Sequence, residues 1–391
     1  MAGKMRSLGS FMLWACVCAS LAAAPKPPAG RGPELLRYDT PYYLVYTDLP
    51  PDGAAEAVAR MARLGEVLRL RTRELGFSGK ITARLPFFLY ARHGDYLAAT
   101  HAAPDSAGVF LGDRLVAAAT DSRGSAAWHV VQHEAFHQFA AATTGTEFPA
   151  WLNEGLGEYF GEALFTGDGY TTGVVPAWRL ARVKRSLKDN TLQPLAGFAR
   201  LSQQQWNQQM TLARYDQAWS LVQFLLHGDA GKHRERVARY VKSLGDGRSH
   251  EQAWSDAFGD WADFTRAWND YWERLPPEGT PGVYAETNVA TVTSFLARAA
   301  AAGQQFDSFA DFTGIATSGN LRCDPKDWLP PYLLKRALDE ADKSGTTFCL
   351  AGSDKATTLT ARLHDGTELV GRFTLLNGRP HTIAVTRSTS P

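Results

Sequence analysis

The chain has 391 residues, of which 45% are hydrophobic and 21% charged, with 41 Lys and Arg against 40 Asp and Glu. This composition excludes a disordered or collagen-like protein, and the balanced charge leaves no basic field to hold a nucleic-acid backbone. No apolar run reaches the roughly 18 residues of a membrane-spanning helix. The length predicts two domains, or one large domain with a small appendage.

Residues 1–24 have the features of a secretory signal peptide. Lys4 and Arg6 precede an apolar stretch over 11–24 that ends in three alanines. We therefore expect export to the periplasm or the extracellular space, without a transmembrane domain once the signal is removed. Residues 13–16 (Leu-Trp-Ala-Cys) also resemble a lipobox, so a lipoprotein tethered through Cys16 is an alternative, and a retained anchor is another.

A Pro/Gly linker over 25–33 precedes a domain over 34–275. Hydrophobic periodicity predicts these elements in the domain: strands over 42–47 and 85–91, a helix over 54–75 between them, one or two short strands over 108–120, and helices from 125 to about 271. Near the end of this domain, Trp261, Phe264, Trp268 and Trp272 share one helix face, which is typical of core packing.

The Pro and Gly residues that begin at Pro276 predict a second linker over 276–288, followed by a C-terminal accessory module over 289–391. The elements expected in this module are a helix over 289–302 and strands over 357–363, 367–375 and 381–386, with hairpin turns at Asp365-Gly366 and Asn377-Gly378. In an exported protein, Cys323 and Cys349 are expected to form a disulfide, the alternative being two separate thiols.

The most informative stretch is His133-Glu134-Ala135-Phe136-His137. On an α-helix, residues four apart lie on the same face, about 6 Å apart along the axis. Two imidazoles placed in this way can bind one zinc ion, with Glu134 beside the position of an attacking water. The spacing therefore predicts His133 and His137 as metal ligands and Glu134 as the general base.

A second motif, Trp-Leu-Asn-Glu-Gly over 151–155, follows after a short connection. Glu154 can complete a site of two histidines and one glutamate, which leaves a coordination position open for catalysis. One turn further on, Glu158 lies on the same face and is expected to orient a ligating imidazole. We expect Asn153 to brace the two metal-binding helices through hydrogen bonds.

These two motifs resemble those of the gluzincin (peptidase MA-like) zinc metallopeptidases, the group that contains thermolysin and aminopeptidase N. The motif over 151–155 is most similar to that of the aminopeptidase N branch. An uncharacterised bacterial family of secreted peptidase-like proteins has a similar motif. The resemblance is specific over about 127–160. It implies an α+β catalytic domain with a small sheet, a zinc-binding helix and a helical subdomain. By this resemblance Tyr215 donates a hydrogen bond to the oxyanion.

The resemblance implies a secreted zinc metallohydrolase that cleaves a peptide or protein substrate by means of a water activated at the metal. No Gly-x-Met-x-Asn motif precedes His133. Because that motif binds the substrate's amino terminus in the aminopeptidases, its absence favours an endopeptidase. The stretch over 108–119 is expected to be an edge strand that pairs with the substrate backbone. The alternatives are an inactive zinc-binding or peptide-binding protein and a cell-wall amidase.

Overall fold

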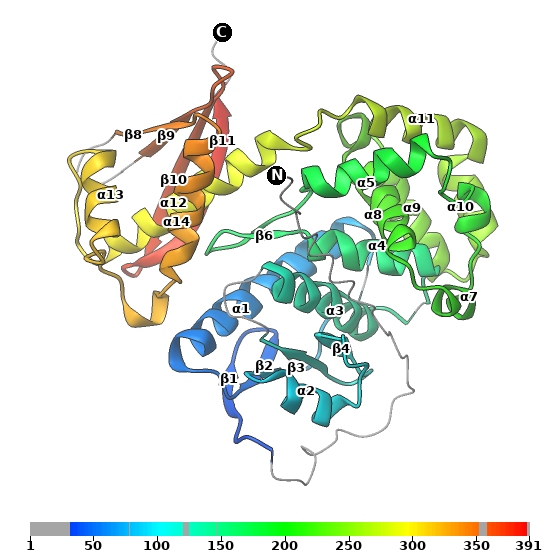
Figure 1. The fold of residues 1–391 in the computed structure, drawn as a ribbon, viewed down its shortest axis with the longest axis horizontal. Coiled ribbons are helices and arrows are strands. Elements are labelled where there is room, and N and C mark those ends of the chain that lie inside the picture. Colours follow the sequence, from blue (N-terminus) through cyan, green and yellow to red (C-terminus); the bar gives the residue numbers. More distant parts are fainter. Residues whose placement is uncertain (1–31, 78, 120–124, 146, 352–357, 389–391) are drawn as a thin grey trace, which may run out of the picture.

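The computed structural model describes residues 32–77, 79–119, 125–145, 147–351 and 358–388. Figure 1 shows three parts: a lobe built on a sheet, a helical lobe, and a C-terminal module on the opposite side of the molecule from the helical lobe. The expected signal peptide, Cys16 and all but the last residues of the first linker lie outside the described residues. No helix of the described residues is long and apolar enough to cross a membrane.

The first lobe contains a mixed sheet of five strands in the order β1-β2-β3-β5-β4. Its elements in chain order are β1 (Leu36–Asp39), β2 (Tyr43–Thr47), α1 (Pro51–Glu74), β3 (Leu85–Tyr90), α2 (His93–Thr100), β4 (Gly108–Phe110), β5 (Leu115–Ala118) and α3 (Ser125–Thr143). Strands β2, β3 and β5 are parallel to one another, whereas β1 and β4 are antiparallel edge strands. The strands expected from the sequence are confirmed, with β4 at the edge and β5 inside the sheet.

Alternate residues of the strands bury opposite faces of this sheet, as strand geometry requires. Leu115 and Ala117 of β5 pack in the main core with residues of α1 and α3, whereas Val116 and Ala118 pack with Tyr96 of α2. Helices α1 and α3 therefore cover one face of the sheet and α2 covers the other. This arrangement places α3 directly behind β4 and β5.

The second lobe is almost entirely helical, as its periodicity predicts. Its elements are α4 (Ala150–Gly161), β6 (Leu164–Phe165), β7 (Tyr170–Thr171), α5 (Ala177–Lys188), α6 (Leu195–Phe198), α7 (Gln203–Gln208), α8 (Leu212–His227), the 3₁₀ helix η1 (Gly228–Gly231), α9 (Arg234–Gly245), α10 (His250–Phe258) and α11 (Trp261–Arg274). Helix α4 packs between α3 of the first lobe and α8 of the second, so it joins the two lobes. The overall class is mixed α and β with small separate sheets, in agreement with the α+β expectation.

The C-terminal module combines helices with a four-stranded antiparallel sheet of order β11-β10-β9-β8. Its elements are α12 (Pro281–Ala301), α13 (Phe309–Thr317), the 3₁₀ helix η2 (Pro325–Asp327), α14 (Pro331–Lys343), β8 (Thr347–Ala351), β9 (Thr358–Arg362), β10 (Glu368–Leu376) and β11 (Arg379–Ser388). Helix α12 lies against β10 and β11, and α14 packs on α12. The turn at Asn377 and Gly378 is confirmed, with both residues at positive φ.

Two expectations for this module are wrong. The linker expected over 276–288 is already helical from Pro281, because proline is well suited to the first turn of a helix, where its missing N–H has no partner to lose. Cys323 and Cys349 are both free thiols, so the expected disulfide is absent. Cys349 lies at an exposed position of β8, and its Sγ contacts the Leu350 carbonyl.

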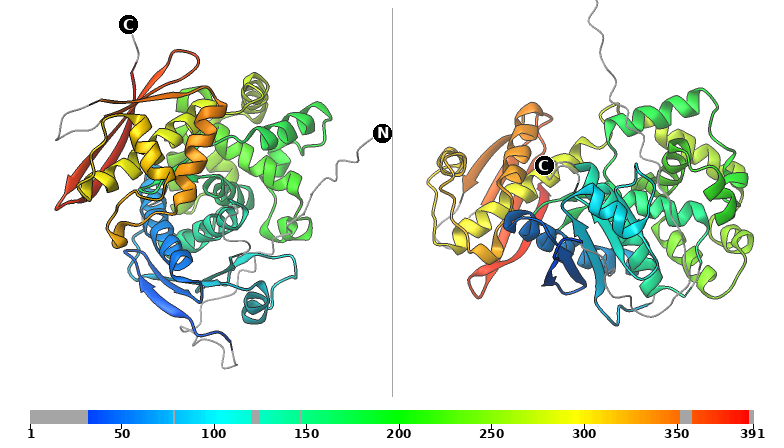
Figure 2. Two further views of the ribbon diagram at one scale, coloured as in Figure 1. Left: turned by 60° about the vertical axis from the view of Figure 1, so that its left-hand side comes forward. Right: turned by 60° about the horizontal axis from the view of Figure 1, so that its bottom comes forward.

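The module is not separate from the first two lobes, although it stands to one side of them in the right-hand view of Figure 2. Phe165 of β6 belongs to the hydrophobic core of the module, together with Val289 and Val292 of α12. In the β6–β7 turn, Asp168 Oδ2 lies 2.6 Å from Arg298 Nη1 of α12. Apolar packing and a nearly buried ion pair therefore fix the module to the helical lobe.

Candidate metal centre

The site lies between α3 and α4, which pack side by side across the two lobes (Figure 1). Two glycines of α4 allow the close approach. A Cβ at Gly157 would lie 2.8 Å from His133 Nε2, and one at Gly161 would lie 2.8 Å from His129 Cε1. The histidine rings of α3 therefore rest directly on the backbone of α4.

His133, His137 and Glu154 form a buried cluster whose ligand atoms all lie within 4.8 Å of one another. Glu154 Oε2 is 3.4 Å from His133 Nε2 and 3.6 Å from His137 Nε2. The structure thus brings together the three residues that the motifs predict as metal ligands.

The other ring nitrogen of each histidine faces an oxygen. His133 Nδ1 is 3.1 Å from Glu158 Oε1, and His137 Nδ1 is 3.3 Å from Asn153 Oδ1. A carboxylate and an amide carbonyl only accept hydrogen bonds, so in both imidazoles Nδ1 must carry the proton. With a cation bound between them, both Nε2 atoms would present a lone pair to it, which is the tautomer that a metal ion requires. Without a cation, an Nε2 atom that faces the Glu154 carboxylate instead carries a proton.

The spacing of these atoms fits a zinc ion. Two ligand atoms at about 2.0–2.1 Å from a tetrahedral zinc lie roughly 3.3 Å apart, close to the observed 3.4 and 3.6 Å. Among the described residues, His137 Nε2 and both carboxylate oxygens of Glu154 are buried without a hydrogen-bond partner. Buried polar atoms left in this state are costly, and a shared cation would satisfy all three.

The electrostatics also favour a cation at this point. Burial alone would raise the pKa of Glu154, but the two imidazoles lower it to about 2. Burial lowers the pKa of His133, yet the contacts with Glu154 and Glu158 raise it to about 10. In the absence of a metal, a proton on His133 therefore supplies the positive charge that these carboxylates require.

Glu134 lies beside this cluster and is held by the edge strand. The Phe110 N–H donates a hydrogen bond of 2.8 Å to Glu134 Oε2. The Leu111 N–H donates to the carbonyl of Arg114, just before β5, and the Ala107 carbonyl accepts from Ala118 of β5, so the N–H of Phe110 points away from β5 and toward α3. Burial raises the pKa of the Glu134 carboxyl, although His137 and His133 lower it. A raised pKa suits a carboxylate that gains and loses a proton near neutral pH.

The motifs do not predict Arg179, which the structure places next to the ligands. This side chain comes from α5 and is 1% exposed. Its guanidinium contacts Glu158 and Glu162 of α4 and Asp216 of α8. Burial would raise the pKa of Glu158, but Arg179 and His129 hold it well below its ordinary value. The signal that could have indicated Arg179 is the pair Glu158 and Glu162, four residues apart at the end of α4 among apolar residues, since two buried carboxylates need a cation.

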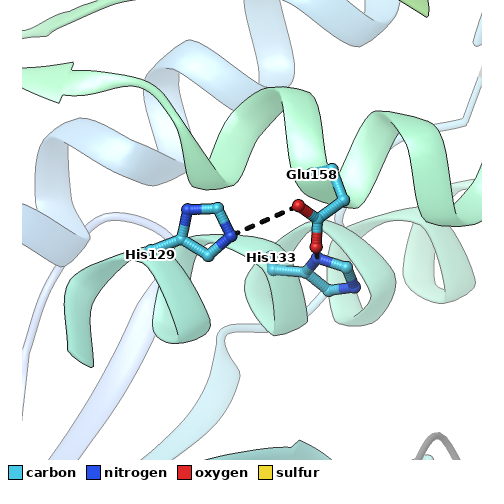
Figure 3. A group of neighbouring side chains, drawn as sticks. All are labelled: His129, His133 and Glu158. Carbon is cyan, nitrogen blue, oxygen red and sulfur yellow. Dashed lines mark ion pairs between the residues drawn. The ribbon is translucent and has the colours of Figure 1, made fainter. Parts of the chain in front are cut away.

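A second group, His129, His133 and Glu158, also brings three potential ligand atoms together, and Figure 3 shows Glu158 reaching from α4 to both rings. His129 Nε2 is 3.5 Å from Glu158 Oε2. The same oxygen lies 2.5 Å from Arg179 Nη2, however, and a metal ion there would stand next to a guanidinium. The group of His133, His137 and Glu154 is therefore the better metal site, and His129 lies at its rim.

Tyr215 of α8 is 7% exposed and lies against the ligands. Its ring meets that of His133 at 64°, with the centroids 6.2 Å apart. Tyr159, the other tyrosine near the ligand helices, is directed elsewhere, because its hydroxyl lies 2.9 Å from His227 Nε2. The expected position of Tyr215 beside the metal centre is thus observed, whereas its hydrogen bond to a substrate stays a prediction.

Comparison with known proteins gives one result. A family model described as "Protein of unknown function (DUF1570)" matches residues 127–247. This segment extends from α3 through α9 and contains every residue of the centre described above except the backbone donor at Phe110. No curated protein and no solved structure matches the chain.

Proposed function

We propose that the chain is a zinc-dependent hydrolase of gluzincin type that cleaves peptide bonds. The observation that supports this most strongly is the convergence of two imidazole Nε2 atoms and the Glu154 carboxylate, with the Nδ1 atoms of the two rings 3.1 and 3.3 Å from oxygens of α4. His133, His137 and Glu154 would hold the zinc. A bound zinc ion supplies Lewis-acid chemistry, which acidifies water and polarises a carbonyl oxygen.

The residues of the chain supply the proton transfers. Glu134 takes a proton from the attacking water and delivers it to the nitrogen of the leaving amine. The hydrogen bond from Phe110 N–H holds one oxygen of this carboxylate in place, so the other is free to accept the proton. Tyr215, beside His133, donates a hydrogen bond to the developing oxyanion.

An extended peptide is the substrate class that fits the neighbouring strand. Strand β4 is an edge of the sheet and lies next to α3, and its Phe110 N–H already faces Glu134. A peptide that pairs with β4 would therefore pass over the metal ligands in a defined register. In this proposal the protein is exported and acts as an endopeptidase, because no aminopeptidase-type motif precedes α3.

The deciding experiment compares two glutamine variants. Glu134→Gln should keep about one zinc per chain but lose peptide hydrolysis by ~10²–10⁴-fold, since a general base is removed and no ligand is. Glu154→Gln should lose zinc itself, because an anionic ligand becomes neutral. Zinc content and turnover of a mixed peptide library are measured on both variants.

A matched control is Glu56→Gln, which changes a buried glutamate of α1 far from the ligands and should keep both zinc and turnover. An unchanged rate in Glu134→Gln contradicts the mechanism. A wild type that binds zinc but cleaves no member of the library indicates a zinc-binding or peptide-binding protein instead. Cleavage of cell-wall fragments alone indicates an amidase.

A further inference from the structure

Arg179 is the most deeply enclosed cation near the metal centre. Its Nη2 lies 2.5 Å from Glu158 Oε2, its Nη1 2.7 Å from Glu162 Oε1, and its Nε 2.9 Å from Asp216 Oδ1. Trp219 of α8 lies under the guanidinium, with its ring centroid 4.4 Å from Cζ. The planar group therefore has a carboxylate at each edge and an aromatic ring on one face, which fixes its orientation.

The contact with Glu158 links Arg179 to the metal ligands. The two oxygens of Glu158 have different partners: Oε1 faces His133 Nδ1 at 3.1 Å, whereas Oε2 faces Arg179 at 2.5 Å and His129 Nε2 at the longer distance of 3.5 Å. The other nitrogen of the His133 ring, Nε2, faces Glu154. A continuous series of contacts thus extends from Arg179 through Glu158 to His133 and the proposed zinc position.

We infer that Arg179 is a positioning residue of this centre: it holds the Glu158 carboxylate so that one oxygen keeps His133 in the orientation and tautomer that bind the metal. This inference rests on the proposed function. The aligned carboxylate fixes the ring of a ligating histidine, and the guanidinium fixes that carboxylate. The ion pairs with Glu162 and Asp216 join Arg179 to the end of α4 and to α8. The additional contact with Glu158 is the one that connects Arg179 to a ligating histidine, His133.

The same helix offers a matched control. Arg182 lies one turn after Arg179 on α5, and it binds both oxygens of Asp216 at 2.7 Å. Among the described residues, Asp216 is the partner of its side-chain hydrogen bonds and ion pair, and the Arg182 side chain is 31% exposed. Replacing Arg182 therefore removes an arginine–carboxylate pair from α5 without changing Glu158.

The test measures the zinc dissociation constant by competition with a chelator. Arg179→Met should raise this constant about 10–100-fold, the usual effect of losing a partner that orients a ligand. Arg182→Met should leave it unchanged. Because Arg179 acts through Glu158, the double variant Arg179→Met/Glu158→Gln should bind zinc no more weakly than Glu158→Gln alone. Cobalt substitution adds a spectroscopic measurement, and the visible absorption bands should change in Arg179→Met and not in Arg182→Met.

Arg179→Met leaves three carboxylates without their shared cation and can fail to fold, so Arg179→Lys is measured as well. Lysine keeps the charge but lacks the planar fork, and we expect a smaller rise in the dissociation constant and a smaller change in the cobalt bands. A folded Arg179→Met or Arg179→Lys with wild-type zinc affinity and cobalt spectrum overturns the inference, as does a double variant whose losses add. If the wild type binds no zinc, the proposed function fails and the inference fails with it.

Discussion

The α3–α4 pair and the α10–α11 pair are both buried packings of helices, but they are built from opposite kinds of side chain. Between α3 and α4, His133, His137 and Glu154 meet with exposed fractions of 1–5%. Between α10 and α11, Trp254 stacks on Trp261 with the ring centroids 3.7 Å apart. Aromatic burial stabilises a fold, whereas buried carboxylates and imidazoles destabilise it unless a cation compensates them.

The difference indicates that the α10–α11 pair serves the stability of the fold and the α3–α4 pair serves the proposed metal binding. Trp254 is also in contact with Tyr240 and Phe264. The imidazole of His250 lies against the same rings, with its Nδ1 2.6 Å from the Tyr240 hydroxyl, and burial lowers its pKa, which favours the neutral form. The α3–α4 pair instead keeps groups whose charges change with pH or with a bound metal. We therefore expect substitutions in the aromatic cluster to change stability, and substitutions in the α3–α4 pair to change metal binding.

The largest effect on stability is expected for Trp254→Ala. Removing a buried tryptophan should lower the free energy of unfolding by about 3–5 kcal/mol, measured by urea denaturation. The zinc affinity of the folded variant should not change, and Trp254→Phe should lose less stability. A weaker zinc affinity in Trp254→Ala would instead show that the two regions are coupled, and the contact of Trp254 with Trp151 of α4, at 6.0 Å, would be the route.

Removal of zinc should have the next largest effect, and it should act through the α3–α4 pair alone. At a zinc concentration 100 times the dissociation constant, the bound ion should stabilise the protein by about 2.7 kcal/mol. The thermal midpoint with and without a chelator measures this difference. Trp254→Ala should keep the stabilisation and Glu154→Gln should lose it.

The stabilisation by zinc should also depend on pH. In the metal-free protein, contacts with Glu154 and Glu158 outweigh burial and raise the pKa of His133 to about 10, against 6.5 ordinarily. A raised pKa contributes stability that is complete below about 6.5 and is lost as the pH rises through about 10. Zinc needs the neutral imidazole and gains nothing from this proton, so its stabilising effect should grow over that range. A constant effect between these pH values would contradict the protonated state assigned to His133.

The smallest effect is expected outside both regions, at Cys349→Ser. Cys349 is exposed and free, so the free energy of unfolding should change by less than about 0.5 kcal/mol. Titration of the denatured, unreduced protein should find both Cys323 and Cys349 as thiols. A loss of about 2–5 kcal/mol would indicate a disulfide after all.

The cluster of His133, His137 and Glu154 could be predicted from sequence because the spacing of its histidines is local. His133 and His137 share a helix face by their spacing alone, and Glu154 lies in a motif shortly after them. Arg179 could not be predicted in the same way, because Asp216 and Glu158 reach it only when α4, α5 and α8 pack together. Side-chain spacing within a helix gives no information about such partners.

The same reasoning applies to the fold. Strands β2 and β3 and helices α1 and α3 have clear periodicity and agree with the prediction, whereas α14 of the C-terminal module was not predicted. Strand β8 was not predicted, because its outward positions are occupied by Thr347, Cys349 and Ala351, which do not form a clear polar pattern. Helix α12 begins at Pro281, eight residues before the start predicted from the sequence. Proline interrupts a helix at interior positions but is accepted in the first turn, so Pro281 indicates a linker and a helix start equally well.

The boundary that the C-terminal module shares with the other two lobes has a consequence for how this chain can evolve. Tyr332 of α14 donates a hydrogen bond to Glu56 of α1 and accepts one from Arg60, while Arg298 of α12 binds Asp168. The Arg60 guanidinium in turn lies 4.7 Å from the ring centroid of Trp128 on α3. A recombination that replaced everything after Leu275 with a foreign sequence would remove partners from Glu56, Arg60 and Asp168 at once. We therefore expect that evolution does not exchange the module as an independent unit. Substitutions at Tyr332 or Arg298 should be accompanied by changes at the residues they contact in α1 and in the β6–β7 turn.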